Sequence, residues 1–375
     1  MARLGHMFNA LQPRVLAAAI TVTVAPYAFP AEIPVDGPGW DLKEQARVAM
    51  VDGKQAIEMR NGFAFRRDVK LMDGTIEFDA RFKGERSFAY IHFRMESDEE
   101  NEELYFRPHK SGLPDTLQYT PEFQHRGQWQ LFHDASSTAS ADLPVNQWFH
   151  VRLVLQGQRG LLFLNRNPKP ALQMDRLARK AAPGYIAFRG FSPDPGDPNV
   201  AFANLEVKPG VVEDAFPAPL KRDPLPSGLV RSYSVSSSFV PPAGPVSAVP
   251  ESVASGSWTS LATEDDGLLI FARSVKTPSG RASVAARLSF DVQAPETRRL
   301  DLGFSDEVTV LLNGRPVFAA DARYSYNFPR QEGLLFLGQS NVYLPLRTGK
   351  NEVTFIVTDG FGGMGLMVRD AGALP

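Results

Sequence analysis

The chain has 375 residues, no cysteine, and 40 Lys and Arg against 42 Asp and Glu, which gives a formal net charge of −2. This length suits two domains that each bury a core of their own. The absence of cysteine excludes a disulfide scaffold, thiolate catalysis and cysteine-ligated zinc or iron–sulfur centres. The balanced charge, without a basic stripe, argues against a nucleic-acid partner.

The N-terminal segment has the features of a secretory signal peptide. Arg14 precedes an apolar run, residues 15–25, which at about 11 residues is too short to cross a bilayer as a helix. We therefore expect residues 1–30 to be a signal peptide, with cleavage near Ala25, Ala28 or Ala31. The expected location is secreted or periplasmic, in a bacterial envelope. No later apolar stretch is long enough for membrane insertion.

The next part of the chain alternates between apolar and polar side chains with a period of two. Residues 75–82 place Ile76, Phe78, Ala80 and Phe82 on one face, and residues 87–95 alternate in the same way. Turn sequences separate such runs at intervals of about 8–15 residues, which is typical of a β-sandwich. We predict a sandwich domain over residues 31–208.

Proline then marks a connector and a second β region. Residues 209–227 are rich in proline, which lacks the amide donor that a sheet interior needs, so we predict an extended linker. Residues 228–375 contain further strand patterns, and Asn313-Gly314 predicts a tight hairpin turn. The predicted fold class is all-β, with two β-sandwich (jelly-roll) domains joined by a Pro-rich linker.

Two family resemblances follow from particular segments. Residues 33–208 resemble a concanavalin A-like (laminin-G-like) lectin/glucanase jelly roll, through residues 74–82, 88–94, 148–153 and 202–207. Residues 228–370 resemble a galactose-binding-like β-sandwich, through residues 302–308, 312–314, 346–353 and 361–366. These resemblances imply a protein that binds or cleaves carbohydrate.

The glutamate motif of the laminarinase-like members is not matched. Those members carry Glu-x-Asp-x-Glu on one strand, with apolar residues between two catalytic carboxyl groups. Residues 96–100 have this spelling, but Ser97 and Glu99 stand between the acids, which predicts a solvated hairpin loop. Residues 77–81 have apolar residues in between, but Arg81 replaces the second carboxylate. The sequence therefore assigns no catalytic residue.

Polar and aromatic side chains instead suggest a ligand face. Tyr90, His92 and Arg94 alternate along one strand, and a similar set follows on the next. Sugar hydroxyls match planar donors and acceptors, and the faces of sugar rings pack on aromatic rings. An ordinary solvated sheet would show the same alternation, and that alternative stays open. The candidate ligand-binding residues, on the concave sheet of the first domain, are Tyr90, His92, Arg94, Glu103, Tyr105, Arg107, Gln118, Tyr119, Trp129, Gln130 and His133.

Metal and cofactor signals are weak. Outside His6, the histidines lie between His92 and His150, but no His-x-His or His-x-x-x-His spacing occurs, so we predict no metal site and no cofactor. The acidic loops at residues 194–199 and 264–267 leave a structural calcium ion as an alternative to plain polar turns.

Three classes of function stay open. The favoured interpretation is a secreted protein that binds an envelope or extracellular polysaccharide. The first alternative is an enzyme, a glycoside hydrolase or polysaccharide lyase with a Tyr/His/Arg site, and the second is an adhesion or scaffold protein. A deep groove with a strongly perturbed carboxylate would favour the enzyme, a shallow aromatic platform the binder, and a broad apolar patch the scaffold.

Overall fold

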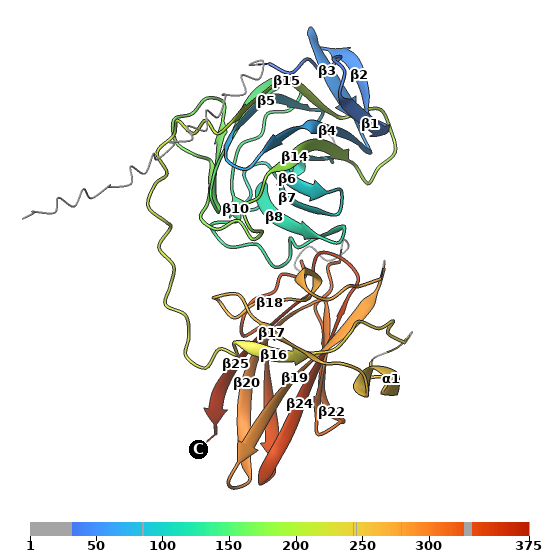
Figure 1. The fold of residues 1–375 in the computed structure, drawn as a ribbon, viewed down its shortest axis with the longest axis vertical. Helices are drawn as coiled ribbons and strands as arrows, with labels where there is room; N and C mark the ends of the chain where they lie inside the picture. Colours follow the sequence, from blue (N-terminus) through green and yellow to red (C-terminus); the bar gives the residue numbers. More distant parts are fainter. Residues whose placement is uncertain are drawn as a thin grey trace, which may run out of the picture. The chain divides into compact units, whose positions relative to one another are not determined.

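The computed structural model describes residues 32–84, 86–242, 244, 246–278, 280–325 and 332–374. The expected signal peptide, residues 1–30, lies outside them. Over the described residues the chain is nearly all β, and its strands pair antiparallel into four sheets (Figure 1). The predicted all-β class is confirmed. No helix in this part of the chain has the length and apolar character needed to span a bilayer.

The first sandwich consists of strands β1–β15. One sheet has the order β1-β4-β14-β6-β7-β8-β10, with β9 paired to β8, and the other has the order β13-β12-β11-β5-β15-β3-β2. The strands are β1 (Trp40–Glu44), β2 (Arg47–Val51), β3 (Lys54–Met59), β4 (Gly62–Leu71), β5 (Gly74–Phe82), β6 (Phe88–Ser97), β7 (Glu100–Phe106), β8 (Leu117–Phe123), β9 (Arg126–Gly127), β10 (Thr138–Ala139), β11 (Trp148–Gln156), β12 (Arg159–Leu164), β13 (Leu172–Met174), β14 (Gly184–Phe191) and β15 (Val200–Pro209).

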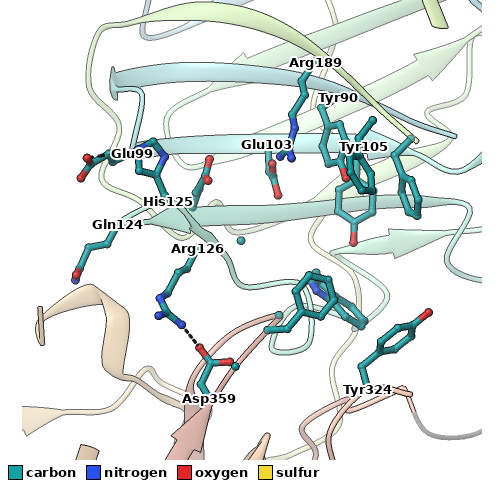
Figure 2. Close-up of a pocket in the computed structure, with 18 of the residues that line it drawn as sticks. Tyr90, Glu99, Glu103, Tyr105, Gln124, His125, Arg126, Arg189, Tyr324 and Asp359 are labelled. Atoms are coloured by element: carbon teal, nitrogen blue, oxygen red, sulfur yellow. Dashed lines mark hydrogen bonds and ion pairs between the residues drawn. The ribbon is translucent and has the colours of Figure 1, made fainter. Parts of the chain in front are cut away.

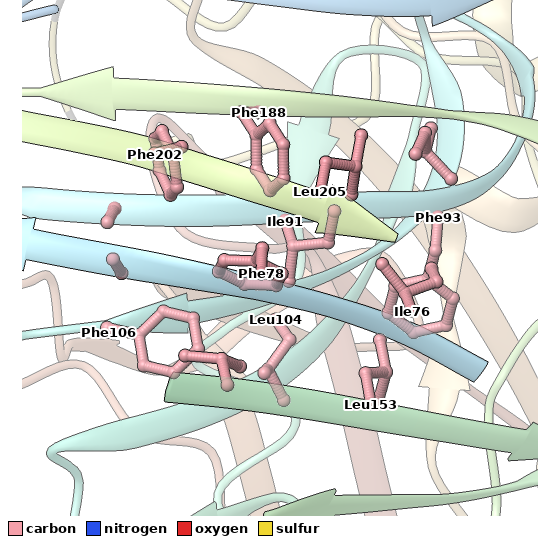
Figure 3. Packing of buried hydrophobic residues seen from close by; sticks show 14 of the residues in the cluster. Ile76, Phe78, Ile91, Phe93, Leu104, Phe106, Leu153, Phe188, Phe202 and Leu205 are labelled. Carbon is pink, nitrogen blue, oxygen red and sulfur yellow. The ribbon is translucent and has the colours of Figure 1, made fainter. Parts of the chain in front are cut away.

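Alternating apolar residues meet between these two sheets. Phe78 of β5 is fully buried, as the period-two pattern predicts, and it packs against Phe188 of β14 and Phe202 of β15. The rings of Phe188 and Phe202 stack with their centroids 4.3 Å apart (Figure 3). The opposite residues of β6, β7 and β8 therefore lie on the outer face of the eight-stranded sheet.

The second sandwich consists of strands β16–β25. Its sheets have the orders β17-β16-β19-β24-β21-β22 and β18-β25-β20-β23, and buried residues of both sheets form one core. Asn313 and Gly314 both have positive φ and join β21 to β22, as predicted for this turn. The elements are β16 (Ser232–Val235), α1 (Glu251–Ala254), β17 (Thr259–Ala262), β18 (Leu269–Ile270), β19 (Ala282–Val292), β20 (Glu296–Ser305), β21 (Glu307–Leu312), β22 (Arg315–Asp321), β23 (Ser340–Leu346), β24 (Gly349–Asp359) and β25 (Gly365–Ala373).

The two sandwiches contact each other within one compact unit. Phe123 and Leu131 of the first pack with Leu268, Ile270 and Leu335 of the second. Polar contacts between the two sandwiches, such as those of Arg126 and His133, flank this apolar cluster. The contact brings loops of the second sandwich to one end of the outer face of the eight-stranded sheet.

Candidate functional site

A cavity of about 970 Å³ lies between the outer face of the eight-stranded sheet and loops of the second sandwich (Figure 2). Strands β6, β7, β8 and β14 supply the side chains of one wall, and residues 324 and 359–362 belong to the opposite sandwich. The side chains and backbone that line the cavity include Tyr90, Glu103, Tyr105, Arg107, Glu122, Arg126, Trp129, Arg189, Tyr324, Asp359, Phe361 and Gly362.

Strand pairing brings four of the candidate residues together. In the β6–β7 register, Tyr90 lies opposite Tyr105, and His92 lies opposite Glu103. The Tyr90 and Tyr105 rings are 5.2 Å apart between centroids, and the Tyr90 and His92 rings stack at 5.9 Å. The alternation in the sequence therefore predicts correctly that these four side chains share one face. Tyr90, Glu103 and Tyr105 line the cavity there, whereas His92 is buried beside them.

Gln118 lies beneath the cavity wall. Its Oε1 accepts hydrogen bonds from the Tyr105 hydroxyl and from Nη2 of Arg107, both at 2.5 Å. Its amide nitrogen donates to the backbone carbonyls of Trp129 and Phe132. Because Gln118 is almost completely buried, its role is to hold the Tyr105 and Arg107 side chains that line the cavity.

Arg94 does not belong to this face. Its backbone has φ +50°, and the pairing of β6 with β14 shifts register beside it. Its guanidinium donates to the carbonyls of Met72 and Gly157, at the turns that join β4 to β5 and β11 to β12. The bulge interrupts the alternation, so Met95 rather than Arg94 continues the outer face, where it packs with Tyr185.

Tyr119 also lies elsewhere, in the core between the sheets. Its hydroxyl donates to Glu102 Oε2 at 2.6 Å. Gln118 and Tyr119 are consecutive in β8 and must point to opposite faces. The expectation that both face one ligand was therefore wrong for Tyr119.

Gln130 and His133 lie at the contact between the sandwiches. Gln130 Oε1 accepts a hydrogen bond from the Ser305 hydroxyl at 2.8 Å, and His133 Nε2 bonds the carbonyl of Leu335 at 2.7 Å. Trp129, in the same loop, lines the cavity. The structure thus separates these three loop residues, because no strand imposes alternation on them.

Several cavity residues were missed by the sequence analysis. Glu122 lies four residues after Gln118 in β8 and therefore points to the same face, and Arg189 follows the core residue Phe188 in β14 and therefore points away from the core. The two-residue alternation in the sequence could thus have identified both as residues of the outer face. Tyr324 and Phe361 reach the cavity from the second sandwich, and nothing local in the sequence indicates that contact.

Burial raises the pKa of both the Glu103 and the Glu122 carboxyl groups of this site. The Glu103 side chain is 7% exposed, and burial, together with the neighbouring Glu122 carboxyl, raises the pKa of Glu103 to about 8. Burial also raises the pKa of Glu122, and this is opposed by a hydrogen bond from Asn101. Burial lowers the pKa of His92 to about 4, which keeps the imidazole neutral near pH 7.

Asn101 connects His92 with Glu122. Its Nδ2 donates to Glu122 Oε2 at 2.7 Å, so its Oδ1 faces His92 Nδ1 at 2.9 Å. Since an amide oxygen only accepts, His92 Nδ1 carries the proton.

His92, Glu103 and Glu122 offer donor atoms that all lie within 4.8 Å of one another. Nδ1 is the nitrogen of His92 closest to the carboxylates, at 3.7 and 3.9 Å, and its hydrogen bond to Asn101 occupies it. This set therefore fits a hydrogen-bonded carboxyl pair better than a metal centre.

The two acidic loops for which a calcium ion was an alternative, residues 194–199 and 264–267, direct oxygen atoms toward arginine. Arg60 donates to the carbonyls of Asp194 and Asp197, and Arg176 and Arg273 pair with Glu264.

Residues 96–100, whose sequence matches the Glu-x-Asp-x-Glu motif, form the hairpin between β6 and β7. Asp98 and Glu99 have side chains 43% and 59% exposed, which confirms a solvated loop. Asp98 pairs with Arg67.

No family model matches the chain, and no curated protein matches it. Similar solved structures include the carbohydrate-binding module CBM66 from Bacillus subtilis (14% identity, 45% of this chain and 95% of that one, TM-score 0.35). A β-glucanase from Bacillus licheniformis (10%, 48% and 99%, TM-score 0.37) and the exoplasmic/lumenal domain of VIP36 with bound Ca²⁺ and Man3GlcNAc (9%, 49% and 91%, TM-score 0.36) are also similar. These scores are too low to carry an argument, so the fold and the site rest on the chain's own sheets and side chains.

Proposed function

We propose that the cavity binds a carbohydrate. The observation that carries this proposal is that aromatic rings line the cavity from both sandwiches. Tyr90 and Tyr105 lie on the side of the sheet and Tyr324 on the opposite side (Figure 2). Trp129 packs edge to face against Tyr324 and Phe361, with centroids 5.8 and 5.9 Å apart. Aromatic rings of this kind pack against the C–H faces of sugars.

Polar groups in the same cavity match the hydroxyl groups of a sugar. Arg107 is held by Gln118 and Asp115, and Arg189 lies over the Tyr90 ring at 5.0 Å. A guanidinium presents several donors in one plane, and its preformed position limits the entropy lost on binding. The combination of apolar rings with a few fixed polar groups is typical of small-molecule sites.

The size of the cavity favours an oligosaccharide over a single small ligand. A volume of about 970 Å³ lies near the upper end of the range of roughly 300–1,000 Å³ that is typical of ligand sites. Because residues 1–30 predict export, we expect the ligand among extracellular or envelope glycans. A hollow lined by rings from two sandwiches fits this role better than adhesion through a flat apolar patch.

Binding can be tested on an array of extracellular polysaccharides and their oligosaccharides, followed by calorimetry with each positive ligand. Trp129→Ala and Tyr324→Ala are expected to weaken binding of a positive ligand at least tenfold. Tyr343→Ala is the matched control, because Tyr343 is 51% exposed on β23 and does not line the cavity. Failure of the wild-type protein to bind any glycan, or equal binding by all variants, would overturn the proposal.

A further inference from the structure

We propose that Glu103 and Glu122 hydrolyse a glycosidic bond of the carbohydrate held in the cavity, with retention of the anomeric configuration. This inference rests on the proposed function, because it needs a sugar bound against the outer face of the eight-stranded sheet. It replaces the Tyr/His/Arg site of the sequence analysis with a pair of carboxyl groups on neighbouring strands.

The geometry of the pair is the first argument. Glu103 of β7 pairs with Thr120 of β8, and Glu122 follows two residues later on the same face. Both side chains line the cavity, and their ligand oxygens lie within 4.8 Å of each other. Retaining glycosidases hold their two carboxyl groups about 5–5.5 Å apart, whereas inverting enzymes leave about 6.5–9.5 Å for a water molecule.

The two carboxyl groups have different surroundings, which is the second argument. Glu122 accepts a hydrogen bond from Asn101 Nδ2, and such a bond stabilises the ionised form. Among the described residues, Glu103 has no corresponding side-chain donor at hydrogen-bond distance, and burial favours its neutral form. The environment therefore assigns the proton to Glu103 and the negative charge to Glu122, as a general acid and a nucleophile require.

The absence of a paired cation is the third argument. Within the described part of the chain, the only ion-pair partner within 4.0 Å of either carboxyl is His92, which burial keeps neutral. Two buried acids without a cation destabilise a fold. Such an arrangement at the wall of a cavity is typical of a functional site.

The reaction balances with water as the second reactant. In the first step a Glu122 oxygen forms a bond to the anomeric carbon, the bond from that carbon to the glycosidic oxygen breaks, and the Glu103 proton moves to the departing oxygen. In the second step Glu103, now a carboxylate, takes a proton from water while the water oxygen attacks the anomeric carbon. The ester bond breaks and returns its electron pair to Glu122. Two inversions give net retention.

His92 and Asn101 are positioning residues in this scheme. The His92 Nδ1–H fixes the orientation of the Asn101 amide, and the amide in turn orients the Glu122 carboxylate. Tyr105 is a poor base, because burial raises the pKa of its hydroxyl and Gln118 accepts its proton in a hydrogen bond.

The experiment compares glycan binding and glycan cleavage in the same variants. With an oligosaccharide that binds the wild type, Glu103→Gln and Glu122→Gln are expected to retain binding within a few-fold and to lose product release by about 10³-fold, measured by mass spectrometry. Glu102→Gln is the matched control: Glu102 is equally buried in β7, burial raises its pKa to about 7, and its carboxylate accepts from Tyr119 on the core side.

A mechanism-based probe tests the role of each acid. A 2-deoxy-2-fluoroglycosyl fluoride that matches the bound sugar should label the wild type at Glu122 and release fluoride, and it should leave Glu122→Gln unlabelled. Binding without product release in the wild type would overturn this inference while leaving the proposed function intact, and absence of binding would remove both. Loss of cleavage in EDTA that Mn²⁺ or Zn²⁺ restores would replace the acid pair with a metal site and overturn the inference.

Asn101→Ala separates positioning from a purely structural role. We expect a lower kcat with little change in KM, and a shift in the acidic limb of the pH profile to higher pH, because Glu122 loses its hydrogen bond. Asn101→Asp is expected not to restore activity, because a carboxylate cannot donate to Glu122. A variant that loses stability but keeps the pH profile would contradict the positioning role.

Discussion

Nη1 of Arg126 lies 2.6 Å from Oδ2 of Asp359, and this ion pair joins the first sandwich to the loop that carries Phe361 (Figure 2). The Asp359 side chain is 1% exposed. The same guanidinium donates to the carbonyls of Pro278 and Gly280. One arginine of β9 therefore fixes two segments of the second sandwich against the cavity.

Arg126→Met is expected to destabilise the protein by about 3–5 kcal/mol, because it leaves the Asp359 carboxylate buried without its cation. The measurement is chemical denaturation followed by tryptophan fluorescence. The double variant Arg126→Met/Asp359→Asn should recover most of the loss, since the uncompensated charge is then gone. A cost below about 1 kcal/mol in the single variant would show that water reaches Asp359 and that the pair contributes little.

Glu103→Gln is expected to stabilise the protein at alkaline pH. In the folded state the pKa of Glu103 is raised from 4.5 to about 8, so the folded state binds a proton that the unfolded state has released. The contribution of this group is fully present below about pH 4.5 and is lost as the pH rises through about 8. The gain in unfolding free energy of Glu103→Gln should therefore grow between pH 5 and pH 9, to on the order of 2–4 kcal/mol. A gain that is constant with pH would contradict the raised pKa.

The rate of cleavage is expected to follow a bell-shaped pH profile. The acidic limb reports ionisation of Glu122, and the alkaline limb, near pH 8, reports loss of the Glu103 proton. The groups that also face this pair or influence its charge are Tyr90 and His92 of β6, Glu100 and Tyr105 of β7, His125 after β8, and Arg189 of β14. Glu103→Gln should abolish the alkaline limb of any residual activity. If the alkaline limb persists in this variant, a group other than Glu103 causes it.

Phe361→Ala is expected to weaken ligand binding by about 1 kcal/mol, or roughly fivefold, without a measurable change in Tm. The reason is that Phe361 is 61% exposed and contributes a ring face to the cavity rather than to a core. Calorimetry and thermal unfolding on the same sample give both quantities. A large fall in Tm would mean that Phe361 supports the contact between the sandwiches.

Arg94→Met is expected to show the opposite behaviour. Its side chain is 2% exposed, donates to the carbonyls of Met72 and Gly157 in two turns, and pairs with Asp73. The variant loses charge-assisted hydrogen bonds to both turns and the ion pair with Asp73, so we expect a loss of about 1.5–3 kcal/mol in stability with unchanged ligand affinity per folded molecule. Weaker ligand binding by the folded variant would show that Arg94 contributes to the ligand site.

The fold was predictable because alternation is a local property. Each of Ile76, Phe78, Ala80 and Phe82 is fully buried, and their two-residue spacing is visible in the sequence. The same rule predicts that Tyr90 and His92 share a face, as they do, and it fails at Arg94, where a bulge inserts one residue. A bulge depends on the pairing with β14, which the sequence of β6 alone does not contain.

The chemistry of the site was less predictable for a related reason. Glu103 and Glu122 are 19 positions apart, and only the register between β7 and β8 brings their carboxyl groups together. Period two marks both as outward-facing residues, but the Glu-x-Asp-x-Glu motif describes two acids on a single strand and does not match acids on neighbouring strands. The contribution of Tyr324 requires the contact between two separate cores.

Some residues of the cavity lie on strands of a sheet, and others lie on a loop. Glu103 and Glu122 stand on adjacent strands inside a sheet, whereas Phe361 belongs to a segment of glycine-rich chain after β24. Ladder hydrogen bonds hold the acids to a common frame, and the loop can change length or sequence without disturbing that frame. Under the proposed function, variants of this loop would alter which sugar is bound while the carboxyl pair stays the same, so ligand preference and reaction type would be separable traits of this architecture.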